Sequence, residues 1–277
     1  MTTCYMLRQR RILRLSGPER DTFLQGLITN DVGRATPGNG LFAALLTPQG
    51  KILFDFILAA EGSSLLIDCE AASAEALMRR LLMYRLRAKV EIGLEESWGI
   101  AVLTGAEVQP PEGSVAFADP RSEALGLRVL ASQAVLDAWA GTHGFTLAGD
   151  ADYAARRIAI GIPEGEAEFG SAATLALEGN LDILGGVDFE KGCYVGQELT
   201  ARTHYRGKVR YRLFPVTLDG DAAPGSEVTA GGKTIGTLVS RADGKGIARL
   251  RQEDLETGPL AAGGTPLTAR PLPERRS

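Results

Sequence analysis

The chain has 277 residues, of which 44% are hydrophobic and 23% charged, and its formal net charge is −4. This length allows two or three packed domains, and the composition is ordinary for a soluble globular protein. An acidic chain has no general attraction for nucleic acid or an anionic membrane, so we expect neither as a partner. The longest apolar runs, such as LFAALL and GIAVL, are far too short to span a bilayer.

Cysteine and histidine usage limits the redox and metal chemistry of the chain. The three cysteines are Cys4, Cys69 and Cys193, and no C-x-x-C motif occurs. An odd number of separated cysteines argues against a disulfide framework and favours a reducing compartment such as the cytoplasm. Only His143 and His204 are available as histidine ligands. We therefore expect no resident zinc or four-cysteine iron–sulfur site and no permanent metal.

The first ninety residues mix strand and helix signals. RRILRLSG reads as a strand running into a helix, and SGPE predicts a capping box in which Ser16 accepts from the backbone N–H of Glu19. GLFAALLT and ILFDFILAA flank the turn tetrapeptide PQGK and predict a hairpin. SSLLIDCE predicts a strand, residues 71–84 have helical spacing, and RAKVEI predicts another strand. This mixture indicates an α+β layer rather than a Rossmann unit.

The middle of the chain begins at a break, VQPPEG, at residues 108–113. It carries a predicted strand, GLRVL, and predicted helices near residues 133–142 and 151–160. Residues 161–206 are rich in glycine and poor in periodicity, which is typical of ordered functional loops or of disorder.

From Gly207 the pattern is all-β. KVRYRLFPVTL, KTIGTLVSR and KGIARLR are separated by Asp-Gly and Gly-Gly turn signals, which predict a small barrel of about 60 residues. The predicted domains are an α+β domain, a second α+β domain with the motif described next, the barrel and a tail, over residues 1–107, 108–206, 207–270 and 271–277.

The segment EKGCYVGQELTAR, residues 190–202, concentrates unusual residue types around Cys193. A free thiol has a pKa near ~8.5 and is only slightly ionised at neutral pH. Lys191, Arg202 and Arg206 would lower that pKa if the fold brought them close, and would make the thiol reactive. The alternative is that Cys193 is a small buried hydrophobic residue, as we expect for Cys4 and Cys69.

Two further segments carry charge in a suggestive pattern. RGKVRYR, residues 206–212, would place four cations on one face if it formed a strand, and that face would meet a polyanion or simply water. LALEGNLDILGGVDFEKG contains Glu178 and Asn180. A carboxylate near an amide is what a buried 2-amino-4-oxo pyrimidine edge requires, although such residues also cap turns.

KGCYVGQELTAR resembles the K-G-C-[FY]-x-G-Q-E signature of the YgfZ-type folate-binding proteins. These are iron–sulfur cluster maturation factors related to the aminomethyltransferase T-protein of the glycine cleavage system. FLQGLITNDV, LLTPQGKILFDF, YRLRAKVEI, GIPEG and the closing β segment are also similar to that family, in the same order. The resemblance implies an α+β fold of three domains around a central channel that holds tetrahydrofolate or a derivative, closed by the small C-terminal β-barrel.

The resemblance also implies roles for individual residues. Cys193 is the candidate reactive thiol, and Glu178 stands where the transferases have a glutamate for the pterin ring, with Ala176 in place of their usual proline. The motif positions are Lys191, Gly192, Cys193, Tyr194, Gly196, Gln197 and Glu198. The residues expected to bind folate are Glu178, Asn180, Tyr194, Gln197, Glu198 and Arg202. The transferases carry an Asp-Asp pair where this chain has Phe54 and Asp55, so Asp55 is a catalytic candidate only if transfer chemistry occurs.

The sequence thus supports one main hypothesis about function and two alternatives. The main hypothesis is a tetrahydrofolate-binding accessory factor for assembly or repair of iron–sulfur clusters, with folate and iron–sulfur client or assembly proteins as partners. The location would be the cytoplasm, or the mitochondrial matrix for a eukaryotic source. One alternative is a folate-dependent one-carbon transferase, so enzymatic activity stays open. The other is a non-catalytic scaffold that docks clients through residues 206–212.

Overall fold

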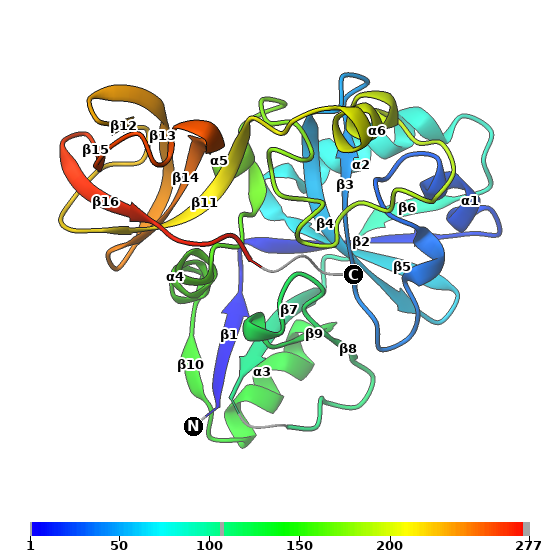
Figure 1. The fold of residues 1–277 in the computed structure, drawn as a ribbon. Coiled ribbons are helices and arrows are strands. Elements are labelled where there is room, and N and C mark those ends of the chain that lie inside the picture. Colours follow the sequence, from blue (N-terminus) through cyan, green and yellow to red (C-terminus); the bar gives the residue numbers. More distant parts are fainter. Residues whose placement is uncertain (1, 106–107, 274–277) are drawn as a thin grey trace. The chain divides into compact units, whose positions relative to one another are not determined.

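The computed structural model describes residues 2–105 and 108–273 of the chain (Figure 1). These residues form two compact units, and each unit is built from three separate segments. Unit 1 contains residues 1–45, 54–153 and 185–195, and unit 2 contains residues 46–53, 154–184 and 196–277. The motif around Cys193 therefore ends unit 1 and continues into unit 2.

The elements follow one another as a mixture of strands and short helices (Figure 1). The strands are β1 (Thr3–Leu7), β2 (Arg10–Ser16), β3 (Leu41–Leu46), β4 (Ile52–Glu61), β5 (Ser64–Glu70), β6 (Glu91–Leu94), β7 (Trp98–Thr104), β8 (Val115–Ala118), β9 (Leu127–Ser132), β10 (Thr146–Ala148), β11 (Tyr211–Leu218), β12 (Glu227–Ala230), β13 (Lys233–Ala242), β14 (Lys245–Arg251), β15 (Leu260–Ala262) and β16 (Thr265–Ala269). The helices are α1 (Arg20–Gln25), α2 (Ala74–Arg85), α3 (Gln133–Thr142), α4 (Asp150–Ile160), α5 (Gly165–Phe169) and α6 (Gln197–Arg206), with 3-10 turns η1 (Val32–Arg34), η2 (Ala71–Ser73), η3 (Glu123–Leu125) and η4 (Gln252–Asp254).

Unit 1 is organised by two five-stranded sheets, in the strand orders β3-β4-β5-β2-β6 and β10-β1-β7-β9-β8. The predicted hairpin is confirmed, because β3 and β4 are neighbours joined at the PQGK turn. Leu77 and Leu81 of α2 are fully buried against the first sheet, and Leu136 and Trp139 of α3 against the second. Each helix thus buries the apolar face that its spacing predicts.

A buried network of charges lies in unit 1. The Asp68 carboxylate on β5 accepts from Arg10 Nε (2.7 Å) and from Arg128 Nε on β9 (2.9 Å). Arg128 also donates to Asp119 (3.0 Å). Burial favours the neutral acid at Asp119, but Arg121 and Arg128 outweigh it and hold the pKa of that carboxyl below its usual value. The network joins β2 and β5 of the first sheet to β9 of the second through oppositely charged side chains that are buried from solvent.

Unit 2 contains the closed barrel, with the strand order β11-β14-β13-β12-β15-β16 and colours from yellow to red in Figure 1. Its interior is an aliphatic cluster that includes Val216, Val228, Leu238 and Leu250, all fully buried. Closure leaves no unpaired strand edge, which a small all-β unit would otherwise have to protect. The mixed α and β content and the closed C-terminal barrel confirm the predicted fold class.

The predicted capping box at residues 16–19 is wrong. Ser16 is the last residue of β2 and pairs with Glu91 of β6. Helix α1 begins only at Arg20, and its N-cap, Glu19, makes no side-chain capping bond. The Glu19 carboxylate instead accepts from the backbone N–H of Lys89 (2.9 Å). Pairing with β6 extends β2 through Ser16, the residue that the local sequence predicts as the cap of the helix.

The predicted basic strand at residues 206–212 is also wrong. Arg206 ends helix α6, and Lys208 and Arg210 are exposed in a segment that precedes β11. Arg212 is buried on β11, where its guanidinium forms two hydrogen bonds with the Asp182 carboxylate (2.6 and 2.9 Å). The four cations share no face, so the scaffold alternative loses its proposed contact surface.

The predicted domain boundaries stay a prediction, and residues 106–107 and 274–277, at the end of the first predicted domain and of the tail, lie outside the described residues. Within the described part of the chain, no helix has both the length and the apolar character needed to cross a membrane.

Candidate functional site

The loop that leads into the motif is fixed within unit 1 by Thr29 and Asp188. The backbone N–H of Asp188 donates to the Thr29 carbonyl (3.0 Å), and the Thr29 hydroxyl donates to the carbonyl of Gly186 (2.6 Å). The Asp188 carboxylate then accepts from the backbone N–H groups of Glu190 (2.8 Å) and Lys191 (3.0 Å). These contacts set the loop direction before Cys193 is reached.

Lys191 anchors the motif by burying its ammonium group. Its Nζ donates to the backbone carbonyls of Gln25 (2.9 Å), Ile28 (2.7 Å) and Asn30 (2.8 Å). An ammonium has three N–H donors, so all three are used. The Tyr194 ring, itself buried, lies 5.1 Å from the same nitrogen. The sequence suggests that Lys191 acts on the thiol, whereas in the structure its ammonium group binds the last residue of α1 and the segment that follows it.

Burial has a measurable consequence for Lys191. Loss of solvent lowers the pKa of its amine from 10.5 to about 8, although the nearby charges of Asp31 and Asp188 act in the opposite direction. The cation is retained at neutral pH because the surrounding carbonyls and acids replace water as its partners.

Cys193 is exposed, and the other two cysteines are buried. Burial raises the pKa of the Cys4 thiol to about 11 and that of Cys69 to about 12. Cys4 and Cys69 therefore match the interpretation of small hydrophobic residues, and Cys193 does not. Its thiol is open to solvent between the exposed Gly192 and the buried Tyr194, which is the access that a reactive thiol requires.

The second motif glycine, Gly196, opens helix α6 in unit 2. Its φ of +83° lies in the left-handed region, and a Cβ there would sit 2.5 Å from the Thr47 carbonyl oxygen. The Gly196 carbonyl accepts from the hydroxyl of Thr200 (3.1 Å). No side chain fits between this turn and the Thr47 carbonyl, so the glycine is required sterically.

Helix α6 lines a cavity of about 160 Å³ in unit 2 together with the segment that carries Glu178. The backbone of Ala176 donates to Gly50 (3.1 Å), which holds that segment beside the β3–β4 turn. The cavity is lined by Gly50, Leu175, Ala176, Leu177, Glu178, Leu199, Thr200, Thr203, Lys208, Val209 and Arg210. A largely apolar hollow with one carboxylate and two exposed cations at its rim is a binding-site geometry.

The Glu178 carboxylate is mostly buried, with 14% of its side chain exposed, and its Oε2 accepts from Arg249 Nη2 (2.7 Å). Arg249 comes from β14 and also stacks on Tyr211, with its guanidinium carbon 4.0 Å from the ring centroid. The sequence did not predict Arg249, because it appears there as one of several basic residues on a barrel strand. The ion pair orients Glu178 and leaves oxygen lone pairs available for another donor.

The other predicted site residues are distributed between the units. Asn180 is fully buried with φ +65°, and its Nδ2 donates to the Leu213 carbonyl (2.7 Å), which fastens its loop to β11. Gln197 is half-buried, and Glu198 and Arg202 are exposed on α6. Asp55 lies buried on β4, where its charge acts on Cys69. Glu178 is the one predicted ligand residue among those that line the cavity.

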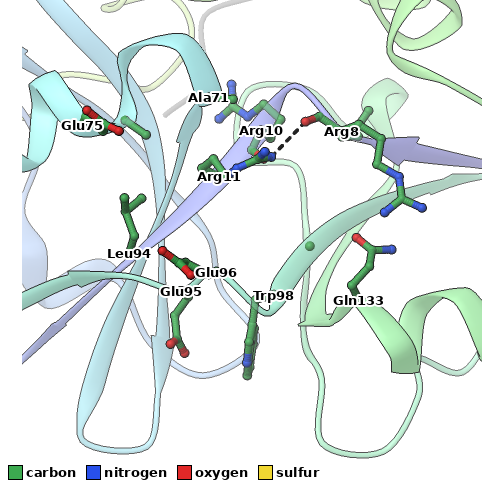
Figure 2. Close-up of a pocket in the computed structure, with 13 residues that line it drawn as sticks. Arg8, Arg10, Arg11, Ala71, Glu75, Leu94, Glu95, Glu96, Trp98 and Gln133 are labelled. Carbon is green, nitrogen blue, oxygen red and sulfur yellow. Dashed lines mark hydrogen bonds between the residues drawn. The ribbon is translucent and has the colours of Figure 1, made fainter.

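A larger cavity of about 530 Å³ lies in unit 1, and Figure 2 shows its mixed polar lining. Arg11 Nη1 donates to the carbonyl of Arg8 (3.0 Å), and Arg8 Nη2 donates to Asp137 (3.1 Å). Glu95 accepts from Arg14 (2.9 Å). Asp137 and Arg14, the partners of Arg8 and Glu95, lie outside the residues that line this cavity. None of the predicted site residues is among those lining it. In the described residues, no group of three or more His, Cys, Asp or Glu side chains is arranged to hold a metal ion.

The fold is that of a solved aminomethyltransferase. The crystal structure of glycine cleavage system aminomethyltransferase T from Bartonella henselae superposes with a TM-score of 0.81 at 15% identity, and covers 99% of this chain and 87% of that one. Residues 210–274 match the family model described as the CAF17 C-terminal beta-barrel domain. The superposition and the family match both describe the fold of this chain.

Sequence relatives are more specific. The chain is 36% identical to the mitochondrial iron–sulfur cluster assembly factor IBA57 of Mus musculus, over 93% of this chain and 80% of that protein. The chain is also 36% identical to the human protein of the same name, over 93% of this chain and 79% of that protein. A homolog from Neurospora crassa is 37% identical over 76% of this chain. The match spans about half (53%) of the length of that relative. These eukaryotic relatives are mitochondrial by name, which is consistent with the location expected for a eukaryotic source. At this level of identity and coverage, the chain belongs to the family of the iron–sulfur cluster assembly factor IBA57.

Proposed function

We propose that this protein assists the assembly or repair of iron–sulfur clusters in other proteins and binds a folate at the Glu178 cavity. The observation that carries the first part is the relationship to proteins named as iron–sulfur cluster assembly factors, at 36% identity over 93% of the chain. The cluster is the cargo of this activity. The resemblance of the motif to YgfZ-type folate-binding proteins supports the second part.

Cys193 is the residue proposed to contact the cluster or its iron. A thiolate is the usual protein ligand of iron–sulfur clusters, and the exposed Cys193 can reach a partner protein without local unfolding. The Lys191 anchor holds the loop that presents it. A four-cysteine site needs more thiolates than one residue supplies, so Cys193 would share the cargo with ligands of the donor or acceptor protein.

The residues of the Glu178 cavity fit the ring end of a folate. A pterin presents two adjacent N–H groups, and a carboxylate accepts such a pair with both oxygens. Glu178 is held for this role by Arg249, and aliphatic side chains of Leu175, Leu177 and Leu199 surround the hollow. The volume of about 160 Å³ suits a ring system, not an entire drug-sized ligand.

The rim of the cavity suits the remaining part of a folate. The glutamate tail of the cofactor is anionic, and the exposed rim residues Lys208 and Arg210 are cationic. These cations would attract the tail without burying it. When bound, the folate would supply a one-carbon carrier or a redox-active ring, and Glu178 would fix its orientation.

Titration of the purified protein with tetrahydrofolate under anaerobic conditions tests the folate part. Glu178→Gln should weaken binding about tenfold or more, because the charge-assisted pair of hydrogen bonds is lost. Glu256→Gln, at an exposed glutamate of the same unit, is the matched control and should bind like the parent protein. Absence of saturable heat for the parent protein would remove folate from the proposal.

A cellular assay tests the cluster part separately. In cells depleted of the endogenous assembly factor, the parent chain should restore the activity of an iron–sulfur enzyme, and Cys193→Ser should not. Cys4→Ser, at a buried cysteine, controls for loss of a thiol as such. Full rescue by Cys193→Ser, together with loss of rescue by Asp55→Asn in a folded variant, would favour the folate-dependent transferase alternative.

A further inference from the structure

The solvent-facing side of α2 carries apolar residues among its charged ones near the C-terminal end of the helix. Leu82 is 37% exposed, Met83 69% and the C-cap residue Leu86 87%. Leu77 and Leu81, which face the core, are fully buried. Since successive helical residues are about 100° apart, Leu82 and Met83 project on the side opposite to this core face. These apolar side chains are therefore not needed to pack α2 against its own sheet.

Leu86 combines its exposure with an unusual backbone. Its φ is +46° and its ψ is −104°, at a helix end where glycine is the common choice. A bulky side chain in this region is strained, and strain of this kind persists where a position has a function. Leu86 gains little from packing within the chain at 87% exposure. The Leu86 side chain thus adds backbone strain to the monomer and is exposed to solvent.

Cations surround these apolar residues. Residues 79–89, RRLLMYRLRAK, hold five Arg and Lys residues and no carboxylate, in a chain whose net charge is −4. Arg79 pairs with the exposed Glu75 (3.2 Å). Across the described part of the chain, Arg85 and Arg87 form no ion pair. The group Arg79, Leu82, Met83, Arg85, Leu86 and Arg87 is called the α2 surface below.

We propose that the α2 surface docks an acidic amphipathic helix of a partner protein. Arg79, Leu82 and Met83 follow the spacing i, i+3 and i+4 that places side chains on one face of α2, and Leu86 lies directly beyond the end of that helix. Arginines beside such a seam pair with Glu side chains at the flanks of the partner helix. The inference is independent of the cluster and folate proposals.

Charge complementarity favours a helix of this kind over an anionic membrane. A bilayer is an extended surface and would face the acidic remainder of the chain as well as the α2 surface. Three exposed apolar side chains are also a small anchor compared with the full apolar face of membrane-surface helices. A single acidic helix meets only the basic patch, and Met and Arg are residue types favoured in protein interfaces.

The test uses the full chain and a synthetic peptide of about 20 residues, long enough to form a helix. The acidic peptide has a seven-residue repeat with Leu along one face of the helix and Glu at the positions beside that face. The matched basic peptide has Lys in place of Glu at those positions. The acidic peptide should bind saturably and lose affinity as salt rises, and the basic peptide should bind at least about tenfold more weakly. Arg85→Glu with Arg87→Glu should weaken the acidic peptide about tenfold or more.

Met83→Ser with Leu86→Ser should weaken the acidic peptide by a similar factor, because the burial of both side chains is lost. Leu147→Ser on β10, a residue 61% exposed and outside the α2 surface, should leave binding unchanged. Equal binding of both peptides, no saturable binding, or unchanged affinity in the α2 variants would overturn the proposal. So would binding to phosphatidylglycerol-containing vesicles in the absence of acidic-peptide binding, which would identify a membrane surface instead.

Discussion

Lys191 and Cys193 stand two positions apart in the motif, and the structure gives them opposite environments. The lysine is buried on three carbonyl oxygens, and the cysteine is exposed. Residue types in a short motif indicate that a site exists, but the direction of each side chain depends on distant partners such as Ile28 and Asn30. The anchoring role of Lys191 could not be predicted for this reason.

The difference in exposure among the three cysteines predicts their reactivity. With an aromatic disulfide reagent at pH 8, the native chain should release one equivalent of thiolate rapidly, from Cys193. Cys4 and Cys69 should react only on unfolding, since burial both hides them and raises the pKa of each thiol. The denatured chain should release three equivalents, and Cys193→Ser should abolish the fast phase. A second fast thiol in the native protein would contradict the assignment.

Replacement of Lys191 tests the anchor. Lys191→Met leaves three backbone carbonyls without their donor and should lower the free energy of unfolding by about 1–3 kcal/mol. Urea unfolding at pH 7 measures this change, and Lys89→Met, at an exposed lysine of unit 1, should change stability by less than about 0.5 kcal/mol.

The stability of the parent protein relative to Lys191→Met should also depend on pH. The pKa of Lys191 is about 8 when folded and 10.5 in its ordinary state, so the unfolded chain binds more protons between these values. The parent protein should therefore become more stable relative to Lys191→Met as the pH rises from 8 towards 10.5. Urea midpoints at pH 7.5 and 9.5 suffice, and a relative stability that falls over this interval would show that the amine is not desolvated.

Among the secondary-structure elements, local patterns were sufficient where the periodicity was regular. The β3–β4 hairpin, β5, α2, α3 and the barrel strands lie where apolar spacing and turn residues predict them. The sequence pattern does not predict helix α6, because QELTARTHYR has few apolar residues and follows a glycine-rich segment. The alternating charges of residues 206–212 predict a single strand because they have strand periodicity, but the chain there passes from the end of α6 to the start of β11.

The two motif glycines should respond differently to substitution. Gly196→Ala places a Cβ 2.5 Å from the Thr47 oxygen at φ +83°, and should cost about 2–4 kcal/mol of stability. A Cβ on Gly192 meets nothing within 4 Å, so Gly192→Ala should be nearly neutral. Thermal unfolding of both variants checks the difference, and equal effects would mean that the left-handed turn before α6 is not rigid.

Replacement of Leu86, at the end of α2, should change the stability of the protein and its binding of the acidic peptide in opposite directions. Leu86→Gly removes a strained φ of +46° and should raise the free energy of unfolding by about 1 kcal/mol. The same change should weaken the acidic peptide, because the most exposed apolar group of the α2 surface is lost. Leu82→Ala, on regular helix, should weaken binding without the gain in stability. A destabilised Leu86→Gly protein would show that Leu86 contributes to packing.

At the scale of the whole molecule, the buried charges of unit 1 depend on one shared carboxylate. Asp68→Asn removes the acid that both Arg10 and Arg128 contact, and Arg128 then keeps only its pair with Asp119 among its two acidic partners, so the change should cost about 3–5 kcal/mol. Asp137→Asn, at the exposed pair with Arg8, should cost less than about 1 kcal/mol. Chemical unfolding of the two variants measures both values, and similar small losses would indicate that water reaches the network.

The composition and order of segments were enough to predict an α+β chain that ends in a barrel, but only part of the candidate site. Glu178 was identified from its neighbours in the sequence, whereas Arg249 comes from a barrel strand 71 residues later. Charge pairs between such distant positions depend on how strands are paired in register, and a single sequence does not specify this. The cavity beside α6 was likewise hidden, since the helix itself was not predicted.

Each unit is assembled from three separate stretches of chain, and this has a consequence for synthesis on the ribosome. Unit 1 receives its last stretch, residues 185–195, only after residues 154–184 of the other unit have been made. The Asp188 and Lys191 contacts to residues 25–30 thus form when more than two-thirds of the chain has emerged. At about 5–20 residues per second, the early sheets must wait several seconds for their closing loop, a period in which a chaperone can hold them.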